Sequence, residues 1–382
     1  MEKYANRAVL TAFLAFGIAA SAFAAEPLSF STDRVELRAD IVAGGLENPW
    51  GLAFLPGGGA LVTERPGRMR LIGADGTLSE PIGGLPEIAA IGQGGLLDVA
   101  VAADFAQSGT IFFTFAEPGR GGAGTAIASA RLVRDGAAAR LEDVRVLFSM
   151  AKKTGRGQHF GSRIVVHPDG TIFFTTGDRG EGPRAQDMGD AAGAVLRINA
   201  DGSVPSDNPY ASGAGGALPQ IWSKGHRNPQ GLAIDSAGTL WTVEHGAKGG
   251  DEVNTPQAGR NYGWPVISYG VDYSGTKIGQ GTEAPGYEQP VHYWDPSIAP
   301  SGLVVYEGAM FPEWRGDLLA GALKFQLLSR LDRDANGNIV AEERMLDGAF
   351  GRIRDVNVAP DGAIWLLTDE TDGQVVRLSR GD

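Results

Sequence analysis

The sequence predicts an all-β protein, a six-bladed β-propeller with four-stranded antiparallel blades. Three observations support this prediction. Glycine and proline supply 57 and 21 of the 382 residues, well above the roughly 12% of average proteins, and glycine disfavours helix interiors. Short strands follow glycine-bearing turns six times along the chain. These strands are continuously apolar rather than alternating, as expected where sheets pack on both faces.

Each of the six repeats consists of a turn with glycine and a short apolar strand. A blade of four strands needs about 40–50 residues, so six copies with insertions account for residues 26–382 as one propeller domain. The extra length falls between the third and fifth copies, where loops can build a site on one face of the ring. A β-sandwich or two stacked β domains are alternatives that would not need six similar units. The copies begin at Gly59, Gly109, Gly170, Gly238, Gly316 and Gly362.

Residues 1–25 are predicted to be a secretory signal peptide rather than part of the fold. Lys3 and Arg7 precede an apolar run from Ala8 to Ala20, and Ala22-Phe23-Ala24 supplies small residues for cleavage. A single membrane anchor is the alternative, but no stop-transfer cluster of charges follows the run. We therefore expect a periplasmic protein without membrane attachment after cleavage.

Charge and cysteine content exclude several classes of function. With 33 basic and 45 acidic residues the net charge is −12, which argues against nucleic acid or an anionic membrane surface as partner. The absence of cysteine excludes disulfides, thiol nucleophiles and Cys-ligated zinc or iron–sulfur clusters. The chain also has no Gly-x-Ser-x-Gly elbow, no Walker loop and no His-Glu-x-x-His zinc helix.

Histidine 159 is the first candidate for proton chemistry. It lies in the glycine-rich loop Gly155-Arg-Gly-Gln-His-Phe-Gly161, immediately before a predicted strand. Asp178 ends the next strand and can return to the same face to orient the imidazole. His167, beside a Pro-Asp-Gly turn, and His292, among aromatic residues, are expected to be structural.

Two segments place arginines at predicted strands. Gly225-His-Arg-Asn-Pro229 places Arg227 and Asn228 before a strand, and the residues alone favour a surface turn there. Arg352 and Arg354 alternate along a strand and therefore lie on one side of it. Two parallel guanidinium groups suit carboxylates or phosphates, while an exposed ladder paired to acids is the competing interpretation.

Two segments contain oxygen ligands of the kind that Ca²⁺ prefers. Gly246-Ala-Lys-Gly-Gly-Asp-Glu252 combines carbonyls exposed by glycine with two carboxylates. Residues Asp332 to Glu343 fit the spacing of an EF-hand loop. An EF-hand needs flanking helices, whereas this segment has strands on both sides and Asn336-Gly337 at its turn. We interpret it as a hairpin within a blade.

Nine short motifs in order resemble one known family, the soluble quinoprotein glucose/sorbosone dehydrogenases, and especially the bacterial periplasmic aldose sugar dehydrogenases. The resemblance covers about residues 40 to 380, and the ordered set is far more specific than any single motif. The motifs are Asn48-Pro-Trp-Gly-Leu52, Gly92-Gln-Gly-Gly-Leu96, His159-Phe-Gly161, Gly225-His-Arg-Asn-Pro-Gln-Gly231, Glu244-His-Gly246, Gly250-Asp-Glu252, Asn261-Tyr-Gly-Trp-Pro265, Ala299-Pro-Ser-Gly302 and Arg352-Ile-Arg-Asp355.

The resemblance implies two cofactors, pyrroloquinoline quinone (PQQ) and calcium. His159 would be the general base that removes the proton from the anomeric hydroxyl of an aldose. A hydride would then pass to the quinone and leave a lactone. Asp178 would hold the productive tautomer of His159, and Arg227 would stabilise developing oxyanion charge.

The resemblance also assigns binding residues. Calcium at the quinone would use the carbonyls of Gly246 and Ala247. A second, structural ion would use the Glu252 side chain and the Tyr262 carbonyl, with Asp251 nearby. The positions that match cofactor-binding residues of the family are Gln93, Arg227, Asn228, Tyr273, Lys324, Arg352 and Arg354.

Two departures from the family pattern affect these expectations. Ala247 stands where the family often has proline, which keeps a carbonyl ligand but leaves the loop less rigid. Gln158 precedes the base where glucose-specialised members have an acid, which favours broad aldose specificity. The segment from Ser268 to Ser301 is expected to cover the site, or else to pack against a partner subunit.

Two other functions are compatible with a six-bladed ring. A calcium-dependent lactonase would need several carboxylate or amide ligands converging at the axis. A non-catalytic carbohydrate-binding propeller would leave His159 without a role. The electron acceptor is unknown from the sequence, as is the choice between monomer and homodimer.

Overall fold

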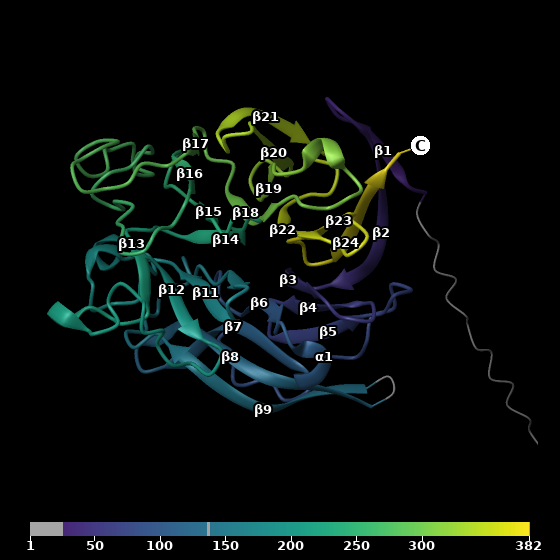
Figure 1. The fold of residues 1–382 in the computed structure, drawn as a ribbon, viewed down its shortest axis with the longest axis horizontal. Coiled ribbons are helices and arrows are strands. Elements are labelled where there is room, and N and C mark those ends of the chain that lie inside the picture. Colours follow the sequence, from purple (N-terminus) through teal and green to yellow (C-terminus); the bar gives the residue numbers. More distant parts are fainter. Residues whose placement is uncertain (1–25, 136–137, 382) are drawn as a thin grey trace, which may run out of the picture.

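The computed structural model describes residues 26–135 and 138–381, so the signal peptide predicted at residues 1–25 lies outside the described residues. Six sheets are arranged as blades around one axis (Figure 1), which confirms the predicted propeller. All named strand pairs are antiparallel. In the described part of the chain, no helix combines the length and apolar character that a membrane crossing requires.

The blades follow one another in chain order, and short helical turns occur only in the connections. The first three sheets are β3 (Pro49–Phe54), β4 (Ala60–Glu64) and β5 (Arg68–Ile72); β6 (Leu96–Val101), β7 (Thr110–Gly119), β8 (Gly122–Asp135) and β9 (Ala138–Ser149); and β10 (Ile164–Val166), β11 (Thr171–Thr176), β12 (Ala194–Asn199) and β13 (Ile221–Lys224). The next two are β14 (Pro229–Ile234), β15 (Leu240–Glu244), β16 (Asp251–Asn254) and β17 (His292–Trp294); and β18 (Pro300–Val305), β19 (Leu318–Ala322), β20 (Leu328–Arg333) and β21 (Ile339–Met345). The helical turns are α1 (Phe105–Ser108), η1 (Gly182–Gln186), η2 (Ala214–Gly216) and η3 (Pro312–Trp314).

The sixth sheet joins the two ends of the described chain. Its order is β1-β2-β24-β23-β22, so β2 (Glu36–Leu46) pairs with β24 (Gly373–Arg380) and closes the ring by backbone hydrogen bonds. Figure 1 shows β2 beside β24. Four of the six sheets have the predicted four strands; the closing sheet has five and the first has three. The remaining strands are β1 (Leu28–Ser31), β22 (Ile353–Val358) and β23 (Ile364–Thr368).

Each predicted turn-and-strand copy corresponds to the second strand of a blade. The six strands are β4, β7, β11, β15, β19 and β23. The glycines before them all have positive φ, from +66° at Gly109 to +88° at Gly316, a conformation that L side chains rarely adopt. Strands β4 and β11 are buried along their whole length, as their continuous apolar pattern predicts. The EF-hand-like segment is a hairpin, because Asp332 on β20 pairs with Ala341 on β21.

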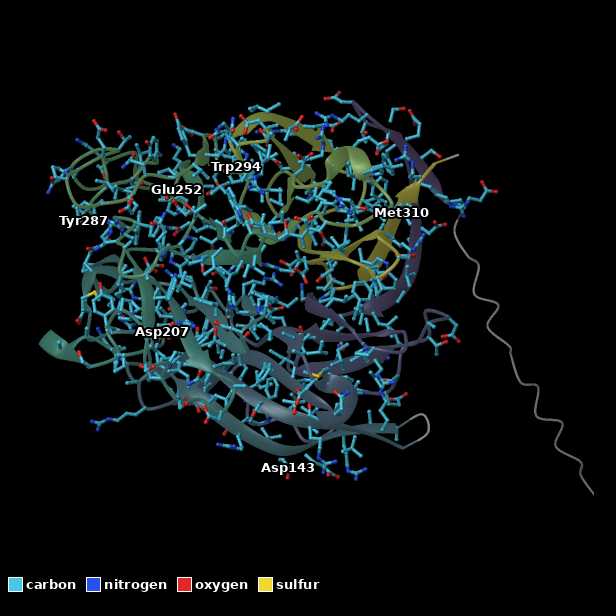
Figure 2. The ribbon with its side chains drawn as sticks, viewed as in Figure 1. Asp143, Asp207, Glu252, Tyr287, Trp294 and Met310 are labelled. Atoms are coloured by element: carbon cyan, nitrogen blue, oxygen red, sulfur yellow. The ribbon has the colours of Figure 1, made fainter. Side chains whose placement is uncertain are left out.

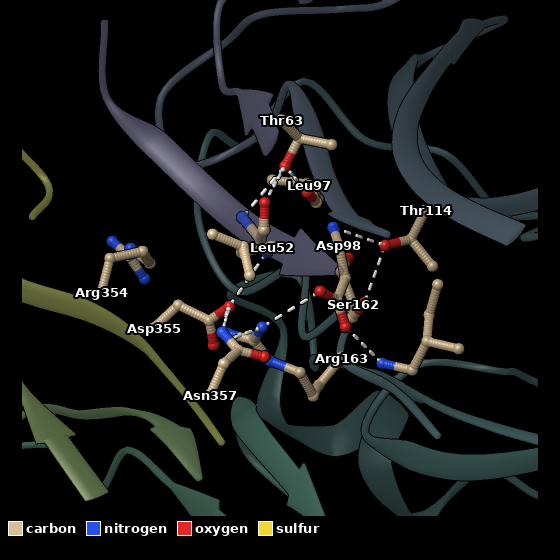
Figure 3. A network of polar contacts seen from close by, with 12 residues as sticks. Leu52, Thr63, Leu97, Asp98, Thr114, Ser162, Arg163, Arg354, Asp355 and Asn357 are labelled. Atoms are coloured by element: carbon tan, nitrogen blue, oxygen red, sulfur yellow. Dashed lines mark hydrogen bonds and ion pairs between the residues drawn. The ribbon is translucent and has the colours of Figure 1, made fainter. Parts of the chain in front are cut away.

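A buried ion-pair network joins three blades at the axis (Figure 3). Arg163, immediately before β10, lies 3.1 Å from Asp98 on β6 and 2.8 Å from Asp355 on β22. Asp98 also accepts the Ile164 N–H at 2.7 Å, and Asp355 accepts the Leu52 N–H at 3.2 Å. Burial raises the pKa of Asp98 to about 6, although Arg163 opposes this rise. One arginine therefore compensates two buried carboxyl groups.

Replacing Arg163 by methionine is expected to lower the free energy of unfolding by about 3–5 kcal/mol at pH 7, because two buried carboxylates lose their partner. The loss should shrink at pH 5, where these carboxyl groups take up protons more readily. Thermal and urea melts at both pH values measure it. The control Arg377→Met breaks an exposed pair with Asp361 and should change stability by at most about 1 kcal/mol. Equal losses in the two variants would contradict the prediction.

Candidate active site

A cavity of about 320 Å³ lies at one end of the ring, above the axial network. Gln230 connects the two, because its side chain lines the cavity and its carbonyl accepts Arg163 Nε–H at 3.0 Å. Three arginines and one aspartate face the cavity, a balance that suits an anionic ligand. Its lining comes from distant parts of the chain: Trp50, Arg65, Gly92, Gln93, Gln230, His245, Ala299, Leu323, Arg352, Arg354 and Asp369.

The predicted arginine pair shares one carboxylate in this cavity. Arg354 is buried and pairs with Asp369 at 2.6 Å, while its other terminal nitrogen donates to Gln230 Oε1 at 2.8 Å. Arg352 reaches the same carboxylate at 3.2 Å with its side chain 41% exposed. Both arginines hold the pKa of Asp369 well below its ordinary value, against the effect of burial. The pair therefore keeps a net positive charge toward the cavity.

His159 and Asp178 form a close pair beside the cavity. His159 Nδ1 lies 2.6 Å from Asp178 Oδ1, which also accepts the Gly180 N–H at 2.7 Å. The second carboxylate oxygen accepts Trp264 Nε1–H at 2.8 Å. Because Asp178 is an acceptor, it selects the tautomer with the proton on Nδ1 and leaves the Nε2 lone pair available. Burial lowers the pKa of His159, with Asp178 opposing and Arg227 adding to the effect, so the imidazole is a neutral base at pH 7.

Two side chains hold the backbone of the His159 loop by hydrogen bonds. Gln93 lines the cavity and its Oε1 accepts the His159 N–H at 2.7 Å. Asn228 Oδ1 accepts the Gly161 N–H at 3.1 Å. The structure thus brings together His159, Asp178 and the predicted cofactor-binding residues Gln93 and Asn228.

Several buried donors near the cavity have no partner within the protein. Among the described residues, Arg227 Nε, Asn228 Nδ2 and Arg354 Nε make no hydrogen bond. Buried polar groups are normally satisfied, and all three belong to residues that the family resemblance assigns to cofactor binding. Arg227 is further held by a hydrogen bond of 3.2 Å to the His245 carbonyl and lies 5.2 Å from the Trp264 ring. This donor set fits a ligand rich in carboxylate and carbonyl oxygens.

His245 lines the cavity although sequence reasoning gave it no role. Its Nε2 lies 2.7 Å from the Pro300 carbonyl, which therefore accepts the ring N–H. Burial lowers the pKa of His245 to about 3, and Arg227 adds to this effect. The ring is therefore neutral and acts as a wall of the cavity.

Four predicted cofactor-binding residues lie outside the cavity lining. Arg227 and Asn228 contact the lining residues His245 and Gln230, whereas Tyr273 and Lys324 are exposed. Tyr273 is 71% exposed in the long segment between β16 and β17. Lys324 is exposed as well, although the preceding residue, Leu323, lines the cavity. The structure gives neither side chain a contact with the arginine pair.

The Gly246 loop follows His245 directly and is supported by Asp251. One Asp251 oxygen accepts the Gly246 N–H at 2.8 Å, and the other accepts Ser297 Oγ–H at 2.7 Å and the Ala299 N–H at 2.8 Å. Asp251 therefore holds the loop instead of presenting a free carboxylate. A Cβ at Gly246 would lie 2.2 Å from the Gly249 carbonyl oxygen, so only glycine lets the loop carbonyls approach this closely.

Glu252, labelled in Figure 2, is a partly buried residue of the fourth blade and shares an amide donor with the buried Glu244. Asn254 Nδ2 donates to Glu252 and to Glu244, each at 3.0 Å. Burial raises the pKa of Glu252 to about 8, and the charge of Glu244 adds to the rise. A divalent cation would relieve this repulsion.

Backbone oxygens would have to complete such a cation site. Within residues 26–135 and 138–381, no group of three or more histidine, aspartate or glutamate side chains is arranged to hold a metal. The Tyr262 ring stacks on His226 at 4.8 Å, and His226 in turn contacts Glu244 at 2.7 Å. The Tyr262 carbonyl accepts no hydrogen bond in the described chain. Glu252 and this carbonyl are the ligands that the family resemblance implies for a structural calcium ion.

Comparisons with known proteins agree with this geometry. The family model "Glucose / Sorbosone dehydrogenase" matches residues 46–377. The chain is 43% identical over 345 residues to the aldose sugar dehydrogenase YliI of Escherichia coli strain K12, covering 87% of this chain and 90% of that protein. It superposes on the apo crystal structure of the soluble E. coli aldose sugar dehydrogenase with a TM-score of 0.87 and 41% identity, covering 90% and 100% of the two chains. A PQQ-bound aldose sugar dehydrogenase from Streptomyces coelicolor matches with a TM-score of 0.74 and 28% identity over 90% and 98% of the chains.

Proposed function

Since the chain belongs to the glucose/sorbosone dehydrogenase family, we propose that it is a PQQ- and calcium-dependent aldose sugar dehydrogenase that oxidises the anomeric carbon of aldoses to lactones. The observation that carries the proposal is the His159–Asp178 pair at 2.6 Å beside a cavity lined by arginines. A PQQ-bound neighbour of the same fold supports the choice of cofactor.

The residues of this chain perform the proton chemistry and the binding. His159 Nε2 accepts the proton of the anomeric hydroxyl, and Asp178 stabilises the imidazolium that results. Arg227 stabilises negative charge that develops beside it, an effect often worth about 3–4 kcal/mol. When bound, PQQ supplies the carbonyl group that accepts the hydride. Arg352 and Arg354 would hold its carboxylates, with Gln93 and Asn228 supplying further polar contacts.

Calcium would bind at two places. The carbonyls of Gly246 and Ala247 would hold one ion, which would supply Lewis-acid polarisation of a quinone carbonyl. Glu252 and the Tyr262 carbonyl would hold the second ion, which stabilises the fourth blade. Tyr273 and Lys324 are proposed to approach the cofactor from the exposed rim of the site.

The geometry at the axis disfavours the lactonase alternative. Such an enzyme needs oxygen ligands around a central ion, but Arg163 occupies the position between Asp98 and Asp355. A carbohydrate-binding protein without activity would not need a neutral histidine with a fixed tautomer. We propose that the enzyme acts in the periplasm after removal of residues 1–25, as a monomer or homodimer.

Reconstitution tests the function. The purified protein is incubated with PQQ and CaCl₂, and reduction of an artificial electron acceptor is followed with a panel of aldoses. We expect activity that depends on both cofactors. The activity should extend over several aldoses, because Gln158 stands where glucose-specialised members of the family have an acid. Titration of PQQ absorbance measures binding independently. Lactone hydrolysis without any dehydrogenase activity would overturn the proposal.

Calcium is expected to raise the melting temperature of the protein by several degrees at 100 times its dissociation constant, where binding stabilises by about 2.7 kcal/mol. Glu252→Gln should lose most of this shift while its metal-free form melts at the native temperature or above, since the repulsion with Glu244 disappears. Asp334→Asn, in the EF-hand-like hairpin, is the control and should keep the full shift. An unchanged shift in Glu252→Gln would place the ion elsewhere.

A further inference from the structure

The loop that presents His159 needs support from outside its own backbone. Residues 155–161 belong to no strand, and His159 has φ +56°, a conformation rare for residues with a side chain. Asp178 orients the imidazole ring, but it makes no hydrogen bond to the backbone of this loop. Another group must therefore fix the position of the His159 backbone, from which the imidazole extends.

Arg179 contacts the loop on both sides of His159. Its Nη1–H donates to the Gln158 carbonyl, and its Nη2–H donates to the Arg156 carbonyl at 2.8 Å. The guanidinium lies 3.3 Å from the centroid of the Phe160 ring. The Arg179 N–H also donates to the His159 carbonyl at 3.3 Å.

This arginine is unusual in its surroundings. Its side chain is fully buried, and no acidic side chain among the described residues forms an ion pair with it. A buried cation is normally paired with an acid, whereas the Arg179 guanidinium contacts loop carbonyls and an aromatic face, and its Nε has no hydrogen-bond partner. Such an arrangement makes the conformation of the loop depend on the guanidinium.

We propose that Arg179 is a positioning residue for His159, which fixes the loop that presents the base and contributes positive charge beside it. The inference rests on the proposed role of His159. Asp178 sets the orientation of the ring. Arg179 holds the carbonyl side of the loop backbone, while Gln93 and Asn228 accept its N–H groups.

The electrostatics agree with this assignment. Burial lowers the pKa of Arg179 to about 9, so the side chain remains cationic at pH 7. Its charge helps to lower the pKa of His159, after the larger effect of burial. The other ionisable groups that act on His159 are Asp178, which raises its pKa, and Arg227, which lowers it; His245 is nearby and neutral.

Three variants separate positioning from general stability. Arg179→Met removes the guanidinium but keeps a long side chain. Arg179→Lys keeps the charge but cannot donate to both carbonyls with the geometry of a guanidinium. Arg330→Met is the matched control, because Arg330 is equally buried, lies 5.6 Å from the Trp314 ring and pairs with Asp317 at 2.7 Å in the fifth blade.

Two measurements are made on each variant. The first is kcat and KM of the reconstituted enzyme against pH. The second is the NMR titration of the His159 ring nitrogens in the protein without cofactor, which reports tautomer and pKa independently of activity. The melting temperature of each variant measures its stability.

In Arg179→Met we expect kcat to fall by roughly 10²-fold, the effect of displacing a reacting group by about 1 Å, with a smaller change in KM. Its His159 pKa should rise, so the acid limb of the pH profile moves to higher pH. Arg179→Lys should restore the pH profile while kcat stays low. Arg330→Met should lower only the melting temperature.

The inference is overturned if Arg179→Met keeps native kcat and native His159 resonances and only melts earlier, as the control does. If Arg179→Met does not fold, an Arg179→Lys variant with native kcat overturns it equally. Failure of the proposed function is a different result, because the native protein itself would then show no PQQ-dependent oxidation of aldoses.

Discussion

Replacing His159 by asparagine is expected to lower kcat for aldose oxidation by about 10²- to 10⁴-fold, the usual contribution of a general base. Asparagine is preferred to alanine because the residue has φ +56°, and asparagine tolerates the left-handed region. The affinity for PQQ should change little, since Arg352, Arg354 and Asn228 remain. The expected result is an enzyme that binds cofactor and turns over slowly.

The measurement combines steady-state turnover at saturating aldose with titration of PQQ absorbance. His159→Ala should lose turnover in the same way, with some additional loss of stability. His167→Asn is the control, because His167 lies in the turn between β10 and β11 and pairs with Asp169 at 2.8 Å instead of with Asp178. Near-native turnover in His159→Asn would remove this histidine from the mechanism.

The fold was predictable because its repeat is local. Each blade contains a turn whose glycine needs positive φ, followed by a strand buried on both faces. A stretch of six residues is enough to recognise both features in the sequence. Closure of the ring has no such signal. Leu37 on β2 pairs with Arg380 on β24, and these positions lie more than 300 residues apart. Counting four strands per blade therefore could not predict which blade contains strands from both ends of the chain.

The site was predictable where chemistry and turn geometry coincide. The His159 loop and the end of the following strand predict the pair with Asp178, and the alternation of Arg352 and Arg354 predicts their common direction. Trp50, Gln230 and His245 lie inside motifs of the family resemblance, yet nothing in their local sequence distinguishes a cavity wall from ordinary packing.

Nothing in the local sequence predicted that Asp369 and Arg65 would line the cavity. Both come directly after the second strand of a blade, a position that many polar residues occupy. The β22–β23 hairpin brings Asp369 within 2.6 Å of Arg354, because Ile353 on β22 pairs with Thr368 on β23. Conversely, the resemblance assigned Tyr273 and Lys324 to the cofactor, whereas both residues are exposed in the structure.

Asp178→Asn is expected to lower kcat by an amount on the order of 10²- to 10⁴-fold, because an amide cannot replace the carboxylate at both of its oxygens. In the native protein the Trp264 indole N–H donates to Asp178 at 2.8 Å. If the amide oxygen of the variant faces His159, its NH₂ group faces this indole N–H, so that two hydrogen-bond donors meet. If the amide turns over, its NH₂ group faces His159 Nδ1 and selects the tautomer whose Nε2 carries the proton. The first orientation loses the charge that stabilises imidazolium, and the second loses the base.

The pH dependence and a second substitution test this explanation. Asp178 raises the pKa of His159, so its neutralisation should lower that pKa and move the acid limb of kcat/KM to lower pH. Trp264→Phe removes the opposing N–H while keeping a ring beside Arg227. The double variant Trp264→Phe with Asp178→Asn should therefore regain part of the lost turnover, because the amide oxygen can then face His159. Losses that simply multiply in the double variant would show that Asp178 acts on His159 through charge alone and not by selecting its tautomer.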